Sequence, residues 1–346
     1  MRNCCAIVMA LCVGCGGKSD TTDTGGETDV VPPTPAGQVV GEGLSASLSS
    51  AWGTSASDVY MVGADDGTGP LVLHYDGVDW TRLETGTTGD LWWVWGDGQD
   101  SVWIAGEGGR VVRYTVSTGT FEEDVVTGDN ITLFGIWGSG PDDLWTVGGD
   151  TNSGAGGTVV HYDGAVWTAV ADLPAEASGG LVYKVWGSSG DDLWMVGTNA
   201  LLMHSDGAGT WRVDPPPIYA SNPLFTVAGC GSEVVAVGGY GNAAIARNEG
   251  SGWVDDSPPA ADVAPGFNGV VVDCTYGTYG VGNNGAIWKR DGAWAPTGET
   301  PLTLLDFHGV WVDPDGGVWA VGGKLSAQND GFVAYDGPAT IPVIAL

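Results

Sequence analysis

Residues 185–197 read VWGSSGDDLWMVG, and this phrase decides the fold because the chain repeats it. Each copy has an anchor residue in the place of Trp186, and a Val-Gly or Ala-Gly pair follows nine or ten residues later. The seven anchors are Trp52, Trp95, Trp137, Trp186, Ala228, Val271 and Trp311. The intervals between them are 43, 42, 49, 42, 43 and 40 residues. A fixed phrase separated by spacers of variable length indicates a structural repeat.

Each copy divides into four short strands. In the copy around Trp137, the first strand ends in Ile-Trp-Gly and a polar turn leads into the second strand, LWTVG. The third strand, TVVHY, ends at an Asp-Gly pair, which is a strong hairpin signal, and the fourth carries Trp167. Four strands in about 40–50 residues is the spacing of a propeller blade. The sequence therefore predicts one all-β domain over residues 44–346, a seven-bladed β-propeller with four antiparallel strands per blade.

The composition agrees with a sheet protein whose blades pack through tryptophan. The chain has 60 Gly and 17 Trp, and 14 of these Trp fall at repeat-equivalent positions, which favours packing between blades over ligand stacking. Trp92, Trp93 and Trp288 fall outside the pattern. With 11 Lys and Arg against 42 Asp and Glu, the formal charge is −31. A surface this acidic repels nucleic acid and anionic lipid, so we expect neither as a partner.

The N-terminal residues have a different character. Residues 6–14 (AIVMALCVG) form a nine-residue apolar run after Arg2, which is too short to span a bilayer and typical of a signal peptide. The run ends at Gly14-Cys15, which resembles the lipobox of bacterial lipoproteins, although Cys12 stands where that family usually has Leu. This resemblance implies a signal peptide over residues 1–15, a lipid on Cys15, and a place in the outer membrane on its periplasmic or cell-surface face. A cleaved signal peptide without a lipid is the alternative.

Residues 16–43 are rich in Thr, Gly, Asp and Pro and have little to bury, so we predict a flexible tether there. The repeat phrase, with its following His-Tyr-Asp-Gly and Trp, resembles the Trp/Gly-rich propeller repeats of myxobacterial lipoproteins. This resemblance covers nearly the whole mature chain and implies the same fold and the same lipid anchor. It implies no activity.

Cys230 and Cys274 follow the two anchors that are not Trp. Neighbouring blades bring equivalent positions close together, and the expected compartment is oxidising. We therefore predict a disulfide between them, which would stabilise the fold by about 3 to 4 kcal/mol in the loop-entropy model. Two buried free thiols are the alternative.

The sequence shows no catalytic or metal-binding constellation. His74, His161 and His204 share one position in the third strand, where side chains fan outward from the axis and cannot converge on a metal. We expect each to pair within its own or the next blade. Paired acids in the turns, such as Asp142-Asp143, are expected to cap those turns rather than bind calcium. We predict no metal and no cofactor.

A function is expected on the variable loops of the rigid frame. The fourth-to-first and second-to-third strand connections share one face and vary most in length and composition. We also expect the residue two positions before each anchor to line the central channel, where one Trp and one Lys are the bulky members. The predicted ligand-binding residues are Asp65, Asp66, Trp93, Asp150, Asn152 and Lys184.

These features favour a monomeric, non-enzymatic module that binds a protein or a polysaccharide, with the membrane contacted only through the N-terminal lipid. The alternative is an extracellular glycosidase or lyase on the same frame. That alternative requires two carboxyl groups about 5–10 Å apart in a deep pocket.

Overall fold

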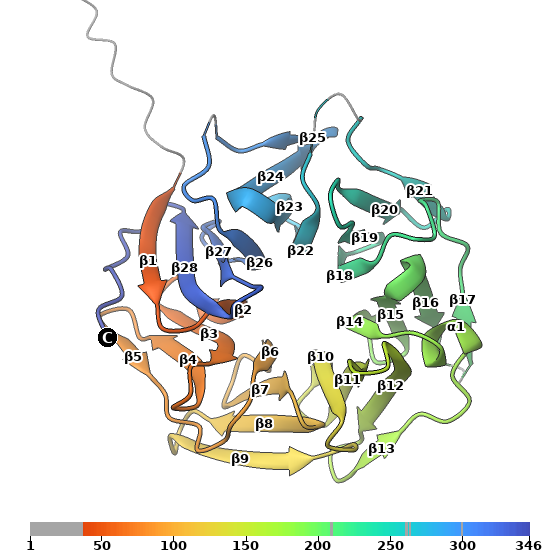
Figure 1. The fold of residues 1–346 in the computed structure, drawn as a ribbon, viewed down its shortest axis with the longest axis horizontal. Helices are drawn as coiled ribbons and strands as arrows, with labels where there is room; N and C mark the ends of the chain where they lie inside the picture. Colours follow the sequence, from red (N-terminus) through yellow and green to blue (C-terminus); the bar gives the residue numbers. More distant parts are fainter. Residues whose placement is uncertain (1–36, 208–209, 260–261, 263, 299) are drawn as a thin grey trace, which may run out of the picture. The chain divides into compact units, whose positions relative to one another are not determined.

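The computed structural model describes residues 37–346 except 208–209, 260–261, 263 and 299. The expected signal peptide, the lipidation site Cys15 and most of the expected tether lie outside the described residues. The described residues form seven four-stranded antiparallel sheets around one central axis (Figure 1). This confirms the prediction of a seven-bladed β-propeller. No described helix is long and apolar enough to cross a bilayer.

Each blade has its first strand at the channel and its last strand at the rim. Blade 1 consists of β2 (Leu48–Ser55), β3 (Asp58–Asp65), β4 (Pro70–Tyr75) and β5 (Trp80–Arg82). Blade 2 consists of β6 (Leu91–Gly96), β7 (Ser101–Gly106), β8 (Arg110–Thr115) and β9 (Thr120–Val125). Blade 3 consists of β10 (Ile131–Gly140), β11 (Asp143–Asp150), β12 (Ala155–Tyr162) and β13 (Trp167–Ala169). Blade 4 consists of β14 (Val182–Ser189), β15 (Asp192–Gly197), β16 (Leu201–Ser205) and β17 (Trp211–Val213).

Blade 5 consists of β18 (Leu224–Cys230), β19 (Glu233–Gly238), β20 (Ala244–Asn248) and β21 (Trp253–Asp255). Blade 6 consists of β22 (Phe267–Asp273), β23 (Gly277–Gly282), β24 (Ala286–Asp291) and β25 (Ala293–Pro296). Blade 7 consists of β26 (Asp306–Val312), β27 (Val318–Lys324), β28 (Asn329–Asp336) and β1 (Gln38–Leu44). The described helical segments are short: α1 (Ala175–Ser178), η1 (Thr198–Ala200) and η3 (Asn283–Gly285).

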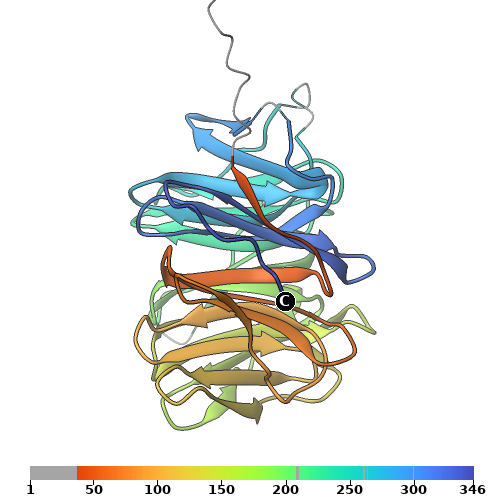
Figure 2. The same cartoon turned by 90° about the vertical axis from the view of Figure 1, so that its left-hand side faces the viewer.

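The N-terminal strand closes the ring. Strand β1 pairs antiparallel with β28 and is the outermost strand of blade 7, so one sheet joins the two ends of the described chain. Figure 2 turns this side toward the viewer and shows β1 beside the C-terminus. The repeat pattern places the start of the propeller at residue 44, whereas the strand begins at Gln38. Residues 38–43 therefore belong to the propeller, because their backbone groups pair with β28 instead of water.

The last residues cover this closing strand. Ile341 and Ile344 are buried in the same core cluster as Val40, and the backbone N–H of Ile344 donates to the Val40 carbonyl at 2.8 Å. Pro342 accepts a hydrogen bond at 3.0 Å from the indole N–H of Trp80 in blade 1. The C-terminal segment thus joins blades 7 and 1 on the outer side of the ring.

The anchor tryptophans form five of the seven contacts between neighbouring blades at the channel side. The ring of each Trp anchor lies against the glycine that follows the anchor of the next blade, and a Cβ added to that glycine would overlap or crowd the ring. The pairs are Trp52–Gly96, Trp95–Gly138, Trp137–Gly187, Trp186–Gly229 and, closing the ring, Trp311–Gly53. A side chain on the glycine would force the packed ring to move, and interiors this dense tolerate little overpacking.

Two interfaces lack this pair, and the residue sizes change together. The anchors Ala228 and Val271 are small, and the next blades carry Val272 and Val312 where the other blades carry glycine. A smaller anchor and a valine in place of the glycine therefore replace the Trp–Gly pair at these two interfaces. The size of the anchor and the size of the residue facing it are thus complementary in all seven interfaces: Trp faces Gly in five, and a smaller anchor faces Val in two.

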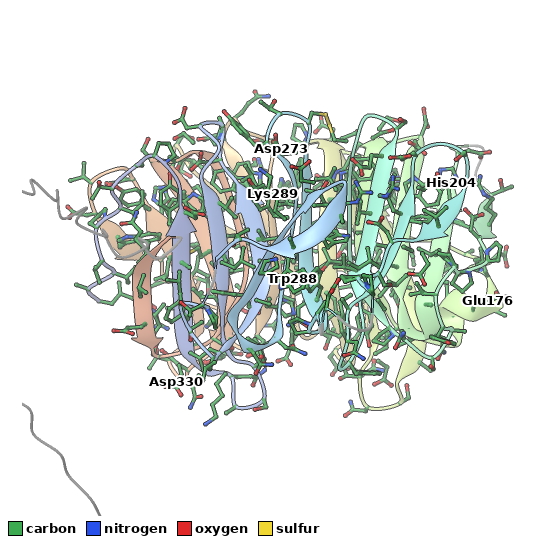
Figure 3. All side chains as sticks on the ribbon, turned by 90° about the horizontal axis from the view of Figure 1, so that it is seen from above. Glu176, His204, Asp273, Trp288, Lys289 and Asp330 are labelled. Carbon is green, nitrogen blue, oxygen red and sulfur yellow. A yellow bond between two sulfur atoms is a disulfide. The ribbon has the colours of Figure 1, made fainter. Side chains whose placement is uncertain are left out.

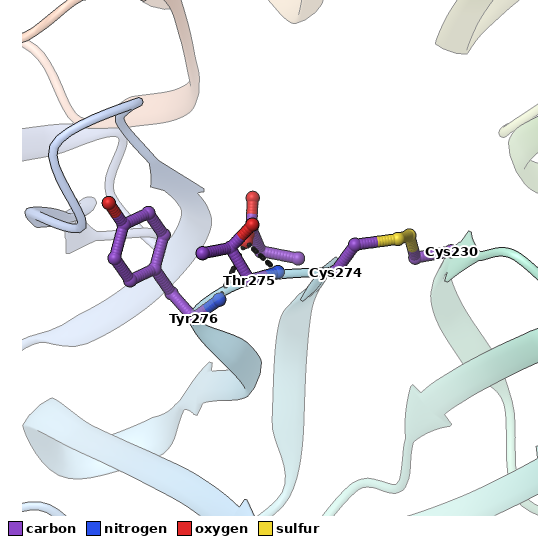
Figure 4. The surroundings of a disulfide bond; sticks show 5 residues. Cys230, Cys274, Thr275 and Tyr276 are labelled. Carbon is purple, nitrogen blue, oxygen red and sulfur yellow. Dashed lines mark hydrogen bonds between the residues drawn. A yellow bond between two sulfur atoms is a disulfide. The ribbon is translucent and has the colours of Figure 1, made fainter.

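A disulfide reinforces the first of these two interfaces. Cys230 in β18 and Cys274 after β22 are bonded, with Cα atoms 5.6 Å apart, which confirms the pairing predicted from the repeat (Figure 4). In the next interface Tyr276, two residues after Cys274 in the same turn, donates through its hydroxyl to the Pro314 carbonyl at 3.0 Å. The two interfaces without a Trp–Gly pair are thus joined by a disulfide between blades 5 and 6 and by a hydrogen bond between blades 6 and 7.

An outer set of hydrogen bonds connects blades 3, 5 and 6 to the blade that precedes each of them. The indole N–H groups of Trp residues in the outermost strands donate to carboxylates that follow the outermost strand of the preceding blade, or lie near its end. The pairs are Trp167–Asp124 at 3.3 Å, Trp253–Asp214 at 3.2 Å and Trp294–Asp256 at 2.8 Å. Trp80 uses Pro342 in the same way, because the C-terminal segment covers the outside of blade 7. The fourth-strand Trp that recurs in the repeats therefore has a role between blades.

We predict that Gly96→Ala destabilises the propeller by about 1 to 3 kcal/mol, because the new methyl group must displace the Trp52 ring from a packed interface. Gly140→Ala is the matched control, since nothing lies within 4 Å of a Cβ at Gly140 in β10. Urea unfolding of both variants measures the difference. Equal stability of the two variants would contradict the Trp–Gly account of blade packing.

Candidate functional site

The two faces of the ring differ in their connections. We call the face with the fourth-to-first and second-to-third strand connections the loop face, and the opposite one the turn face. Figure 3 shows the ring edge-on, with Asp330 and Glu176 on the loop-face side and Asp273 on the turn-face side. The predicted ligand-binding residues Asp65, Asp66, Asp150 and Asn152 all belong to loop-face connections or their edges.

All seven innermost strands share one irregularity near the loop face. Their pairing with the second strand shifts between the residues four and two positions before the anchor, so the residue three positions before the anchor forms a β-bulge. A bulge turns a side chain away from the regular alternation of the strand. The seven bulge residues are Ser49, Trp92, Phe134, Tyr183, Phe225, Asn268 and His308.

Five of these bulge residues form one continuous row of ring contacts, which we call the aromatic arc. The ring centroids are 5.9 Å apart for His308–Trp92, 5.4 Å for Trp92–Phe134, 5.4 Å for Phe134–Tyr183 and 5.6 Å for Tyr183–Phe225. These are the tilted or edge-to-face contacts that aromatic pairs prefer. The aromatic arc therefore packs around the loop-face end of the channel.

Polar side chains of the inner strands donate hydrogen bonds to the backbone carbonyls of the bulges. The carbonyl of Phe134 accepts from Lys184 Nζ at 2.5 Å, and that of Asn268 accepts from Thr226 Oγ1 at 2.6 Å. The carbonyl of Ser49 accepts from His308 Nδ1 at 2.7 Å. A bulge removes a residue from the strand ladder, so these buried carbonyls need such donors.

The structure brings the predicted pair Trp93 and Lys184 together. The Lys184 ammonium lies 4.1 Å from the centroid of the Trp93 ring, and Lys184 is only 3% exposed. Gly135, between them in the ring order, leaves room for the lysine stem. Trp93 and Lys184 directly follow Trp92 and Tyr183 of the aromatic arc in the chain. Binding of a ligand by this pair stays a prediction, and the burial of Lys184 favours a structural role.

Burial governs the protonation of the channel residues. It lowers the pKa of Lys184 to about 7, because the charged ammonium loses its hydration. The pKa of His308 is lowered to about 4, chiefly by burial; the charge of Lys184 contributes to this shift and the bond to Ser49 opposes it. His308 is therefore neutral at pH 7.

The loop acids Asp65 and Asp66 are held by their own surroundings. Asp65 accepts backbone hydrogen bonds from Gly89 at 2.7 Å, Gly67 at 2.7 Å and Gly69 at 3.1 Å, and these bonds lower its pKa. The Arg82 guanidinium binds Asp66 at 2.7 and 3.3 Å and holds the pKa of that carboxyl far below its usual range. Both carboxylates fix the shape of the loop.

Asp150 and Asn152 form a local turn. The Asp150 carboxylate accepts from the backbone N–H of Asn152 at 2.9 Å, and this bond is the main cause of its lowered pKa. Asn152 is exposed at the loop tip. The structure thus spreads the predicted loop residues over blades 1 and 3 and does not bring them together with Lys184.

A groove with two exposed tyrosines lies on the loop face at blade 5, and none of the residues predicted from the sequence lines it. This Tyr240 groove, of about 460 Å³, lies between the connections on either side of blade 5 and is lined by residues that include Tyr219, Asn222, Tyr240, Asn242, Asp255 and Pro258. Tyr219 and Tyr240 are 84% and 73% exposed. The Tyr240 ring lies 6.1 Å from Phe225, so the groove adjoins the aromatic arc.

A second, smaller groove lies on the loop face at blade 6. This Trp288 groove, of about 240 Å³, is lined by residues that include Pro265, Asn283, Asn284, Trp288, Thr300 and Leu302. The irregular position of Trp288 in the repeat was the available sequence signal for it, as the position of Trp92 was for the aromatic arc. Tyr219 and Tyr240 lie in loops outside the repeated phrase, so the repeat pattern of the sequence gives no signal for the Tyr240 groove.

The turn face carries structural networks. Each of the three third-strand histidines pairs with an aspartate of its own blade, as expected from the sequence. The pairs are His74–Asp58 at 2.8 Å, His161–Asp143 at 2.7 Å and His204–Asp192 at 2.6 Å. Each His ring also stacks on the aromatic residue opposite it in the second strand, with centroids 4.0 to 4.2 Å apart. Asp313 caps its turn by accepting from the backbone of Asp315 and Gly317 at 2.9 and 2.8 Å.

The grooves offer little for acid–base catalysis. Of the described residues that line the Tyr240 and Trp288 grooves, Asp255 alone carries a carboxyl group. Within the described part of the chain, no group of three or more His, Cys, Asp or Glu residues could hold a metal ion. Cleavage of a glycosidic bond by a carboxyl pair needs two such groups flanking the bond.

We predict that Lys184 makes folding stability depend on pH between about 7 and 10.5. Its pKa is lower in the folded protein than in the unfolded chain, so the unfolded chain binds more protons in this window and stability rises with pH. Lys184→Met lacks this proton. The stability difference between wild type and Lys184→Met, measured by urea unfolding at pH 7 and pH 9.5, should therefore shift in favour of wild type at the higher pH. A constant difference would show that the lysine stays charged when buried.

Comparison with known proteins supports the fold and gives no family. No family model and no curated protein matches the sequence. Among solved structures, YCF48 from Cyanidioschyzon merolae is similar with a TM-score of 0.65 and 12% identity, over 88% of this chain and 99% of that one. Virginiamycin B lyase from Staphylococcus aureus gives a TM-score of 0.66 and 15% identity, over 84% and 95%. An ancestral GH74 enzyme gives a TM-score of 0.63 and 13% identity, over 86% of this chain and 47% of that one. At these identities the similarity shows a shared propeller fold alone.

Proposed function

We propose that the protein is a non-enzymatic binding module that holds an uncharged polysaccharide in the Tyr240 groove of its loop face. The observation that carries this proposal is the pair of tyrosines, Tyr219 and Tyr240, that stand 84% and 73% exposed at one groove. Two exposed aromatic rings at one groove form an apolar patch of the kind that marks a ligand-binding groove. A tyrosine offers a flat apolar face and a hydroxyl, which suits the mixed apolar and polar surface of a sugar ring.

The polar lining supports the same ligand class. Asn222, Asn242 and Ser257 supply carboxamide and hydroxyl groups that both donate and accept hydrogen bonds, as sugar hydroxyls do. No lysine or arginine is among the described lining residues, so the groove offers no countercharge to an acidic ligand. The formal charge of −31 further opposes polyanions.

A glycosidase or lyase on this frame is the alternative function. Two of the similar folds belong to enzymes, a lyase and a GH74 enzyme, and their chemistry is a property of their own sites. The Tyr240 groove presents the carboxyl group of Asp255 and, among its described lining residues, no second one. Binding without cleavage is therefore the function that this groove supports best.

We also propose that the chain is a lipoprotein of the outer membrane, anchored through Cys15. The topology of β1 suits such an anchor. Gln38 pairs with Tyr335 at the turn-face end of β28, and its side chain donates to the Ala339 carbonyl at 3.1 Å. The chain therefore enters the propeller at the turn face, on the side of the ring opposite the Tyr240 groove, so the groove and the entry of the chain do not compete for the same surface.

We predict that Tyr240→Ala weakens polysaccharide binding at least tenfold, about 1.4 kcal/mol, because it removes the exposed ring of the groove. Val78→Ala is the control, since Val78 is 70% exposed on the turn face. Glycan arrays with the purified chain, followed by calorimetry on each uncharged glycan that binds, measure the effect. Binding that Tyr240→Ala leaves intact, or an array that captures no glycan, would refute the proposed site.

We predict that Cys15→Ser abolishes lipid attachment in a bacterial host. Labelling cells with an alkyne-bearing fatty acid should mark the wild-type chain and leave Cys15→Ser unmarked, because the lipid attaches through the sulfur. Cys12→Ser is the control within the same segment, and it should keep the label. A labelled Cys15→Ser chain would place the lipid elsewhere, and an unlabelled wild type would show a signal peptide without a lipid.

A further inference from the structure

The Tyr240 groove and the Trp288 groove are neighbours on the loop face. The segment 264–266 separates them, with Ala264 lining the first groove and Pro265 lining the second. This segment is bound to the blade 5 loop through an Asn242–Pro265 bridge, with backbone bonds of 3.1 Å from Ala243 to Ala264 and 3.2 Å from Gly266 to Gly241. One stretch of three residues is therefore the partition between the two grooves.

A side chain also connects the two grooves across this partition. Asn283, which lines the Trp288 groove, donates through Nδ2 to the carbonyl of Tyr240 at 3.4 Å. The same residue accepts from Asn268 at 3.3 Å, and Asn268 belongs to the ring of bulge residues. The loops of blades 5 and 6 are thus held in fixed relation by hydrogen bonds. The two grooves are therefore fixed relative to each other before a ligand that spans both of them binds.

The two grooves share their chemistry. Both combine aromatic or proline surfaces with carboxamide and hydroxyl groups; in the Trp288 groove the polar groups belong to Asn283, Asn284, Thr297 and Thr300. Twenty-six described residues line the two grooves, and Asp255 alone is charged. In the whole chain 15% of residues are charged, so four charged residues would be expected among twenty-six. The uncharged character extends over both grooves, which marks them as parts of one surface.

We propose that a linear, uncharged polysaccharide binds across both grooves at once and passes over the segment 264–266. This inference rests on the proposed function and specifies the form of its ligand. Once one part of a polysaccharide occupies the Tyr240 groove, the part that continues over Pro265 is held close to the Trp288 groove. Its binding there is then an intramolecular step. The affinity of a chain long enough to occupy both grooves therefore exceeds that of a short oligosaccharide in one groove.

The experiment compares oligosaccharide lengths on the full chain. Cello-, xylo-, malto- and N-acetylated chito-oligosaccharides of two to eight units are titrated by calorimetry against wild type. In the series that binds, we expect affinity to rise at least tenfold between the short members and the longest, and Tyr240→Ala to weaken all lengths. An affinity that is flat with length while Tyr240→Ala still weakens binding overturns the two-groove inference and leaves the proposed function standing. Failure of every series to bind overturns both.

Variants of the Trp288 groove test the second part of the site directly. Asn284→Gly removes a carboxamide while keeping the backbone relaxed, because the φ of Asn284 is 57° and glycine adopts this conformation readily. Asn199→Gly is the matched control at the equivalent turn of blade 4, where φ is 56° and Asn199 lines neither groove. Thr300→Arg places a bulky cation at the exposed edge of the Trp288 groove.

We expect Asn284→Gly and Thr300→Arg to remove most of the gain from chain length and to leave the affinity for the shortest binding oligosaccharide within twofold of wild type. Asn199→Gly should retain the full gain. Loss of affinity at every length in the Asn284→Gly variant, or full retention of the gain in both groove variants, would overturn the inference.

Discussion

The contact between an anchor tryptophan and a glycine of the next blade is the constraint on which this ring depends. A four-stranded sheet cannot bury its apolar faces alone, so each blade needs a neighbour on both sides. The indole ring fits only where the neighbour lacks a Cβ, which fixes how closely and in which register adjacent blades approach. Because Trp311 of blade 7 uses Gly53 of blade 1 in the same way, the ring closes through the same contact that builds it.

The exception to this rule has consequences for function. Blades 5 and 6 carry Ala228 and Val271 as anchors, and the disulfide joins their turn-face ends. Both grooves lie on the loop face of these same two blades. A cross-link that closes a 44-residue loop stabilises by about 4 kcal/mol in the loop-entropy model, although it lies on the other face of the ring. The blades with the weakest packing signature are thus held covalently beneath the surface that we propose for binding, so their loops can be specialised without loss of the frame.

The repeat predicts the frame because packing requires the same residue types at the same offsets in every blade. Strand number, blade number, the disulfide and the pairing of His74, His161 and His204 all follow from such offsets. The outer strand β1 does not follow, because Gln38–Leu44 contains no anchor and no tryptophan and its role is set by pairing with a distant strand. Of the aromatic arc, the sequence signals only the irregular position of Trp92, because the bulge shifts the arc residues out of the alternation that a strand pattern assumes. The Tyr240 groove depends on loops whose lengths differ between blades, so no internal copy reveals it.

The choice of Asp65, Asp66 and Asp150 as ligand residues illustrates how an acidic surface conceals its binding region. A carboxylate on a loop can bind a partner, or it can accept hydrogen bonds from groups of its own fold. Such bonds are the first cause of all three lowered pKa values: backbone N–H groups for Asp65 and Asp150, and the Arg82 guanidinium for Asp66. A partner that displaced those bonds would have to replace each of them and dehydrate the carboxylate as well. In a protein with a formal charge of −31, a ligand loses the least dehydration free energy when it covers a surface with few charged groups. Among the described residues, that surface consists of the two neighbouring grooves, whose polar side chains are amides and hydroxyls apart from the single carboxylate of Asp255. This composition suits an uncharged ligand.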